Sequence, residues 1–177
     1  MSSSYRVLKS QQIYKGKIIE LRVDRIVEPG GIEADRELVV HPGSVVVLPV
    51  FADGRVLLVR QFRYAARQAL WELVAGGLEP REKPLKAAAR ELEEETGYRA
   101  RRFKLLFNFF PSPGILTERM HMVMAQGLTP GEANPEEDEQ LEVRIFKPGE
   151  LRKMLQEKKI EDAKTLVGLM WFLHRAF

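Results

Sequence analysis

The sequence predicts an α+β fold, in which a mixed β-sheet is covered by helices on both sides and preceded by a small antiparallel β lobe. Three observations indicate this fold. Residues 15–41 contain apolar runs separated by the turn sequence EPGG, residues 44–51 form one continuous apolar run, and residues 83–97 change to a helical period. We therefore expect an N-terminal β lobe over residues 1–43 and a larger domain over residues 44–177.

Composition limits the class of protein. The 177 residues, 45% hydrophobic and 30% charged, suffice for one globular domain with a sizeable core. The chain has no cysteine, which excludes disulfides and thiolate chemistry, so we expect a cytoplasmic protein. Its start lacks the apolar stretch of a signal peptide, and no run approaches the roughly 20 apolar residues of a membrane-spanning helix. A net charge of +3 favours anionic ligands only mildly.

The strands are predicted from apolar runs and the turns between them. Residues 15–41 indicate two or three antiparallel strands, which are too few to be stable alone. The run at 44–51, SVVVLPVF, suits a strand buried on both faces, and the turn ADGR then leads into VLLVRQFRY. Further strands are expected at LWELVAGG, RRFKLLFNFF, ERMHMVMAQGL and LEVRIF.

Three segments have helical periodicity. The segment from Lys83 to Gly97 starts with Pro84 in its first turn and ends at a natural glycine cap, and its apolar stripe comprises Leu85, Ala88, Ala89 and Leu92. Two more helices are expected at PGELRKMLQE and IEDAKTLVGLMWFLHRAF. One face of the last helix is apolar and holds Leu166, Leu169, Met170, Leu173 and Phe177.

The first helix carries an unusual concentration of carboxylates in the stretch RELEEETGY, residues 90–98. Glu91, Glu94 and Glu95 stand at helical positions i, i+3 and i+4, so their carboxylates lie on one face. A Mg²⁺ ion prefers hard oxygen ligands, commonly one or two carboxylates together with waters and substrate phosphates. Taken alone, the stretch is better explained as a solvated helix face, because glutamate is a strong helix former.

The spacing around this helix resembles the Nudix box, the signature of hydrolases that cleave nucleoside diphosphates linked to another group. Gly76 is followed after five residues by Glu82, and after seven more by the run from Arg90 to Gly97. Every polar and glycine position of the box is present, and only Tyr98 departs from the aliphatic residue usual in the family. The resemblance implies a Nudix-type α/β/α sandwich over residues 44–177.

By the same resemblance, the box supplies a metal site. Glu91 and Glu95 are implied as metal ligands, and Glu94 as a catalytic residue close to the same site. The backbone carbonyl of Ala75, just before the first glycine of the box, is implied as a further ligand. The expected cofactor is Mg²⁺, with Mn²⁺ as a possible substitute.

Other residues are implied to support the metal and the catalytic water. Glu82 and Arg90 are expected to orient the glutamates, although helix capping and ion pairing would explain them equally well. Similar enzymes take a catalytic glutamate from the loop before the last strand, which here contains the run EEDE at 136–139. We expect Glu137 to be the general base and Glu139 an added metal ligand, while solvation is the ordinary explanation of such a loop.

Features outside the box resemble the ADP-ribose pyrophosphatase subfamily. Pro113, with Gly114 in the turn PSPG, follows Tyr98 by fifteen positions, as in that subfamily. The segment RQFRYAARQALWELVAGG resembles the strand pair before the box, which implies that Arg63 contacts the diphosphate and that Glu72 lies near the substrate. These four residues, Arg63, Glu72, Pro113 and Gly114, are the predicted substrate-binding set.

The resemblance thus implies Mg²⁺-dependent hydrolysis of ADP-ribose to AMP and ribose 5-phosphate, by a homodimer in which the N-terminal lobe contacts its partner or the substrate. The alternatives are a GDP-mannose or other nucleotide-sugar pyrophosphatase, an enzyme acting on RNA 5′ ends, and a non-enzymatic Nudix module that senses a ligand. The basic run YRARRFK reads more simply as solvated strand than as an RNA contact, so nucleic acid is not expected as a partner. A membrane partner is not expected either.

Overall fold

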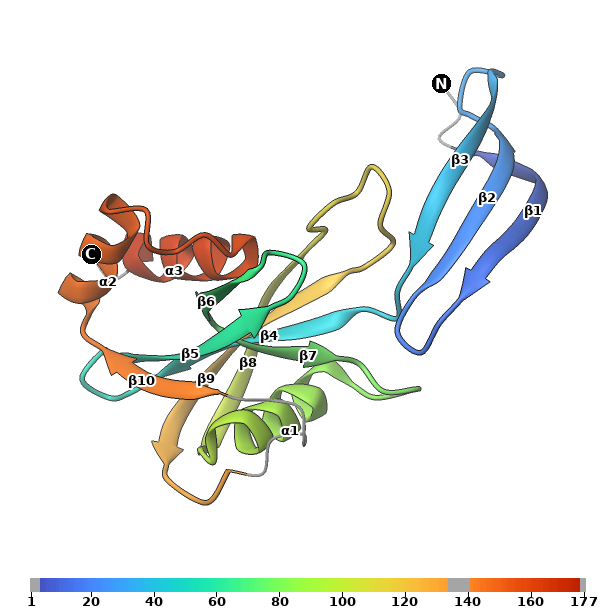
Figure 1. The fold of residues 1–177 in the computed structure, drawn as a ribbon. Helices are drawn as coiled ribbons and strands as arrows, with labels where there is room; N and C mark the ends of the chain where they lie inside the picture. Colours follow the sequence, from blue (N-terminus) through green and yellow to red (C-terminus); the bar gives the residue numbers. More distant parts are fainter. Residues whose placement is uncertain (1–3, 134–140, 176–177) are drawn as a thin grey trace. The chain divides into compact units, whose positions relative to one another are not determined.

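The computed structural model describes residues 4–133 and 141–175 of the chain (Figure 1). It contains two compact units. The small unit comprises Met1–Gly43 and Phe110–Arg119, and the large unit comprises Ser44–Phe109 and Met120–Phe177. The segment Phe110–Arg119 therefore belongs with the N-terminal residues, although it follows the predicted box in the sequence.

The small unit is an antiparallel sheet of three strands in the order β1-β2-β3, formed by Arg6–Lys15, Glu20–Val27 and Glu33–Val40. The segment Phe110–Arg119 joins it through a hydrogen bond of 2.8 Å from the Val39 N–H to the Ile115 carbonyl. The predicted antiparallel lobe is confirmed. However, β1 starts at Arg6 and was not recognised, because its residues are all exposed and lack the alternation that marks a half-buried strand.

The large unit contains a mixed sheet of seven strands. Five run in the order β10-β5-β4-β9-β8, with β6 paired to β5 and β7 to β4. The strands β4 and β9 are parallel and the other pairs are antiparallel. Their bounds are β4 (Ser44–Val50), β5 (Val56–Arg63), β6 (Gln68–Glu72), β7 (Val74–Gly77), β8 (Arg99–Phe109), β9 (Met120–Thr129) and β10 (Glu142–Phe146).

Strand β4 lies between two hydrophobic layers, as its continuous apolar run predicts. Val45 and Val47 pack into the cluster that contains Ala87, Ala88 and Leu92 of α1 (Pro84–Thr96). Val46 and Leu48 point to the other face, into the cluster that contains Leu151 of α2 (Pro148–Gln156) and Leu169 and Leu173 of α3 (Ala163–Arg175).

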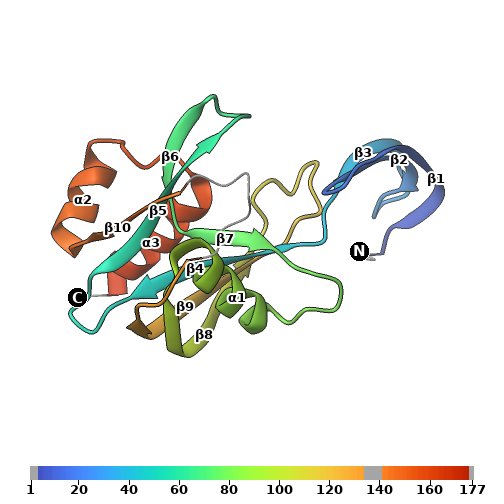
Figure 2. The same cartoon turned by 60° about the horizontal axis from the view of Figure 1, so that its bottom comes forward.

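The helices cover both faces of this sheet. Figures 1 and 2 show α1 on one side of it and α2 and α3 on the other. The predicted α+β class, with an α/β/α sandwich and a separate antiparallel sheet, is confirmed. Among the residues that the structure describes, no helix is both long and apolar enough to cross a membrane.

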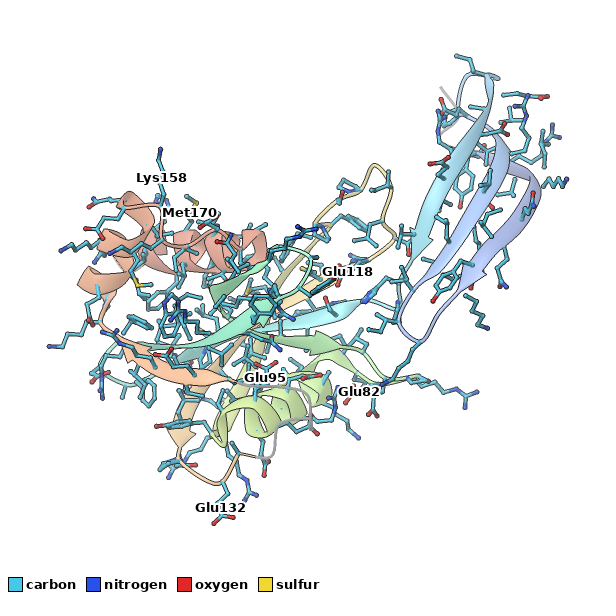
Figure 3. All side chains as sticks on the ribbon, viewed as in Figure 1. Glu82, Glu95, Glu118, Glu132, Lys158 and Met170 are labelled. Atoms are coloured by element: carbon cyan, nitrogen blue, oxygen red, sulfur yellow. The ribbon has the colours of Figure 1, made fainter. Side chains whose placement is uncertain are left out.

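Several details differ from the sequence prediction. The segment LWELVAGG is not one strand, because β6 ends at Glu72 and β7 begins at Val74 on a different partner. On α1, Leu85 is 43% exposed and Ala87 takes its place in the core. On α3, Met170 is 59% exposed and does not contribute to the apolar face (Figure 3). Phe177 lies outside the described residues.

Candidate active site

Helix α1 carries the acidic face and ends as its sequence predicts. Pro84 occupies its first turn, and Gly97 adopts a left-handed conformation with φ of 72° and donates its N–H to the Glu93 carbonyl. A Cβ at position 97 would lie 2.7 Å from the Ala133 backbone nitrogen. Gly97 therefore both ends the helix and lets the backbone at Gly131–Ala133 pass directly against that end.

Arg90 connects the carboxylates around the start of the acidic face. It donates hydrogen bonds to Glu82 at 3.0 and 3.2 Å, to Glu91 at 2.7 Å and to Glu94 at 3.0 Å. It also donates to the Gly77 carbonyl at 3.1 Å, which ties α1 to the end of β7. The Arg90 guanidinium holds the pKa of Glu82 below its usual value. This arrangement fits the predicted role of Glu82 and Arg90 in orienting the glutamates.

Glu91 lies directly over the backbone of β7. A methyl group added at Gly76 would overlap the Glu91 carboxylate, so the absence of a side chain there makes room for it. Ala75, whose carbonyl was implied as a metal ligand, immediately precedes Gly76 and pairs with Val46 of β4. The structure thus brings the Glu91 carboxylate to the residue next to Ala75.

Glu95 lies one turn further along α1 and is only 5% exposed, whereas the Glu94 side chain is 43% exposed. Figure 3 marks Glu82 before α1 and Glu95 near its end. Within the described residues, no three His, Asp or Glu side chains are grouped closely enough to hold a metal ion. The hard oxygen donors Glu91, Glu95 and the Ala75 carbonyl fit the donor type of Mg²⁺, which needs only one or two carboxylates from the protein.

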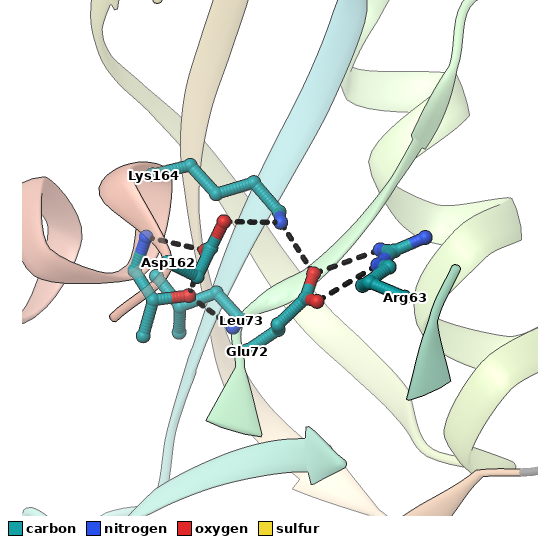
Figure 4. Close-up of polar contacts among 6 residues, drawn as sticks. Arg63, Glu72, Leu73, Asp162 and Lys164 are labelled. Atoms are coloured by element: carbon teal, nitrogen blue, oxygen red, sulfur yellow. Dashed lines mark hydrogen bonds and ion pairs between the residues drawn. The ribbon is translucent and has the colours of Figure 1, made fainter. Parts of the chain in front are cut away.

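Arg63 and Glu72, the last residues of the paired strands β5 and β6, form an ion pair (Figure 4). Arg63 donates from Nε at 2.8 Å and from Nη2 at 2.7 Å to the two Glu72 oxygens, which is the strong bidentate geometry. Burial alone would raise the pKa of Glu72, but the hydrogen bonds from Arg63 and the charge of Lys164 outweigh burial and lower it. The hydrogen bonds to Glu72 raise the pKa of Arg63, and the charge of Glu95 acts in the same direction.

The first turn of α3 supplies further partners that the sequence analysis did not identify. Lys164 forms an ion pair with Glu72 and a second with Asp162 at 2.9 Å. Asp162 accepts the Thr165 N–H at 3.0 Å, and the Thr165 hydroxyl accepts the Leu73 N–H at 2.8 Å. The sequence offers one signal for this group, which is Asp162 placed as a cap before an apolar helix. Nothing local shows that Lys164 reaches Glu72, which lies 92 positions earlier.

The four remaining predicted residues lie outside the described part of the large unit. Pro113 and Gly114 are exposed and belong to the small unit. Glu137 and Glu139 lie outside the described residues. The assignments of all four residues stay predictions.

The fold and the site define a class of protein. The chain matches the NUDIX domain over residues 40–167 and the nucleoside diphosphate sugar hydrolase N-terminal domain over residues 5–39. The chain belongs to the Nudix family, and within it to the hydrolases of nucleoside diphosphate sugars. The N-terminal match covers the three-stranded sheet of the small unit, and the NUDIX match covers most of the large unit together with Phe110–Arg119 of the small unit.

Individual relatives cover nearly the whole chain. The chain is 37% identical to an ADP-ribose pyrophosphatase of Bacillus subtilis and 35% identical to a methanol dehydrogenase activator of Bacillus methanolicus. Each alignment spans 94% of this chain and 91% of the relative. A solved structure described as an ADP compounds hydrolase shares the fold with a TM-score of 0.82 at 22% identity, covering 97% of this chain and 92% of that one.

Proposed function

We propose that this protein hydrolyses the pyrophosphate bond of ADP-ribose to AMP and ribose 5-phosphate in a Mg²⁺-dependent reaction. The observation that carries the proposal is the set of hard oxygens from Glu91, Glu95 and Ala75, on the same unit as the bidentate Arg63–Glu72 pair. A diphosphate needs both parts, a divalent cation and a fixed guanidinium, to neutralise its charge.

The roles of the side chains follow from this arrangement. Glu91, Glu95 and the Ala75 carbonyl would hold Mg²⁺, which would supply charge neutralisation and make water more acidic. Arg90 holds Glu91 and Glu94 in orientation, and Arg63 contacts the diphosphate. Glu137 as general base and Glu139 as an additional ligand complete the proposal, on the family resemblance alone.

The choice of substrate is supported by the relatives. The B. subtilis relative is named for ADP-ribose and aligns over 94% of the chain, whereas GDP-mannose pyrophosphatases are also among the relatives but align over less of it. A GDP-mannose or other nucleotide-sugar pyrophosphatase is the second candidate. The similarity to a methanol dehydrogenase activator keeps a regulatory role open, but a pure sensor has no need of the complete glutamate set retained here.

A substrate panel tests this choice. ADP-ribose, GDP-mannose, ADP-glucose, NADH and diadenosine polyphosphates are incubated with the protein in Mg²⁺ or in EDTA, and the products are separated by chromatography. We expect ADP-ribose to give AMP and ribose 5-phosphate fastest, and EDTA to abolish the reaction. Faster cleavage of another nucleotide sugar would transfer the proposal to that substrate, and no cleavage of any of them would favour the sensor.

We further propose that the protein is a homodimer formed through the N-terminal sheet. A three-stranded sheet needs a covered hydrophobic face to be stable, but the described residues of β1–β3 contribute to neither hydrophobic core cluster, and β1 exposes all ten of its residues, among them Val7, Leu8, Ile13 and Tyr14. Light scattering should therefore give about twice the chain mass of 20.3 kDa. Ile13→Asp should shift the mass toward that of one chain, and a wild-type mass of 20.3 kDa would refute the dimer.

A further inference from the structure

Glu72 is the centre of a network that the proposed chemistry does not by itself explain. Its side chain is 1% exposed and receives hydrogen bonds from two cations, Arg63 and Lys164. A buried carboxylate that loses one such partner keeps an uncompensated charge and its neighbours rearrange. Because the Glu72 side chain is only 1% exposed whereas that of Arg63 is 40% exposed, Glu72 acts on a ligand through Arg63 and not by direct contact.

Lys164 is held in place by the start of α3. Its side chain is 10% exposed, and Asp162 holds its ammonium group from the side opposite Glu72, so that the contacts run from Asp162 through Lys164 and Glu72 to Arg63 (Figure 4). Asp162 is itself fixed, because its other oxygen accepts both the N–H and the hydroxyl of Thr165. The lysine is therefore a rigid support for Glu72.

The same helical turn also fixes the backbone that leads to the box. The hydroxyl of Thr165, which is fully buried, accepts the N–H of Leu73. Leu73 lies between β6, which pairs with β5, and β7, which pairs with β4. Ala75 and Gly76 follow within three residues. The first turn of α3 thus supports the Arg63 guanidinium through Glu72 and the strand of the Ala75 carbonyl through Leu73.

Arg63 remains available to a ligand in this arrangement. Its side chain is 40% exposed, and Glu72 occupies Nε and Nη2, so that Nη1 points away from the carboxylate (Figure 4). Asp162 balances the charge of Lys164, so the four side chains together carry no net charge, and the lysine acts by fixing the position of Glu72.

We infer that Lys164 is a positioning residue for diphosphate binding, which fixes Glu72 and thereby holds Arg63 in the orientation that receives the substrate. The inference rests on the proposed function, because it concerns the same diphosphate. It predicts that loss of Lys164 weakens substrate binding more than it slows the chemical step.

The test is the affinity for ADP-ribose, measured by calorimetry in EDTA so that no turnover occurs. Lys164→Met should weaken binding by about tenfold, the effect typical of losing a residue that orients a ligand-binding group, and raise KM while kcat stays within about threefold. Lys159→Met, an exposed lysine beyond the network, removes the same charge and should bind as the wild type does. Leu173→Ala, which destabilises the core side of α3, should lower Tm without changing affinity.

A double-mutant cycle separates positioning from a structural or direct role. In an Arg63→Met background, Lys164→Met should cause no further loss of affinity, because its effect passes through Arg63. Unchanged affinity of Lys164→Met with a lowered Tm, or an equal loss in both backgrounds, would overturn the inference. If Lys164→Met does not fold, Lys164→Gln is judged by the same criteria.

The wild-type arm of this experiment distinguishes the two levels of the proposal. A wild type that binds and cleaves neither ADP-ribose nor GDP-mannose would overturn the proposed function, and the role of Lys164 with it. A wild type that binds and cleaves ADP-ribose, with Lys164→Met binding it equally well, would overturn only the role of Lys164.

Discussion

Replacement of Glu95 by Gln is expected to lower turnover of the preferred substrate by at least about 100-fold. Loss of a residue that merely orients a metal ligand costs about 10- to 100-fold, so loss of a ligand itself should cost at least the upper value. Glu95 is only 5% exposed, so the substitution removes a charge that is largely shielded from solvent.

The substitution should leave the fold intact, because Gln has the same shape as Glu. We expect Tm to change by less than about 4 °C, the shift that corresponds to about 1 kcal/mol in a domain of this size. Glu93→Gln is the matched control, since Glu93 lies on the same helix but pairs with the exposed Arg99. Initial rates of both variants decide the matter, and near wild-type activity of Glu95→Gln would refute the assignment of Glu95 as a metal ligand.

Gly76→Ala is expected to abolish most activity with little effect on folding. The added methyl group would overlap the Glu91 carboxylate, and the part that has to move is the free end of a flexible side chain, not the backbone. Moving it would draw Glu91 away from Ala75 and break its contact with Arg90. The loss should again be at least about 100-fold, because the proposed metal ligand Glu91 is displaced.

The adjacent glycine provides the control for Gly76→Ala. A Cβ at Gly77 would meet no atom within 4 Å, so Gly77→Ala makes the same chemical change one residue away without displacing Glu91. Rates and melting temperatures of both variants should be measured together. Equal activities would show that the position of Glu91 over Gly76 has no catalytic importance.

The parts of the fold that depend on local sequence were predicted well. Helix α1 was recognised with its Pro84 start and Gly97 end, and β4 was recognised as buried on both faces, because caps, turns and apolar periods are local signals. The box placed Glu82, Arg90 and Glu91 in one group before any contact was known. Each of these conclusions needed only a single stretch of sequence.

Long-range features were missed for a physical reason. At the break between β6 and β7, the Leu73 N–H donates a hydrogen bond to the hydroxyl of Thr165, which lies 92 positions later, and no local pattern contains this bond. The approach of Lys164 to Glu72 has the same origin, since it arises from packing α3 across the sheet. Met170 and Leu85 were assigned to apolar stripes, but helical period alone does not define how wide the buried face is.

The central claim is that the carboxylates of α1 hold the divalent cation over β7. Binding of Mn²⁺, measured by electron paramagnetic resonance in the absence of substrate, tests this claim most directly. The claim predicts that Glu95→Gln and Gly76→Ala each weaken Mn²⁺ binding at least about tenfold, while Glu93→Gln and Gly77→Ala bind as the wild type does. Equal Mn²⁺ affinity in all four variants and the wild type would contradict it.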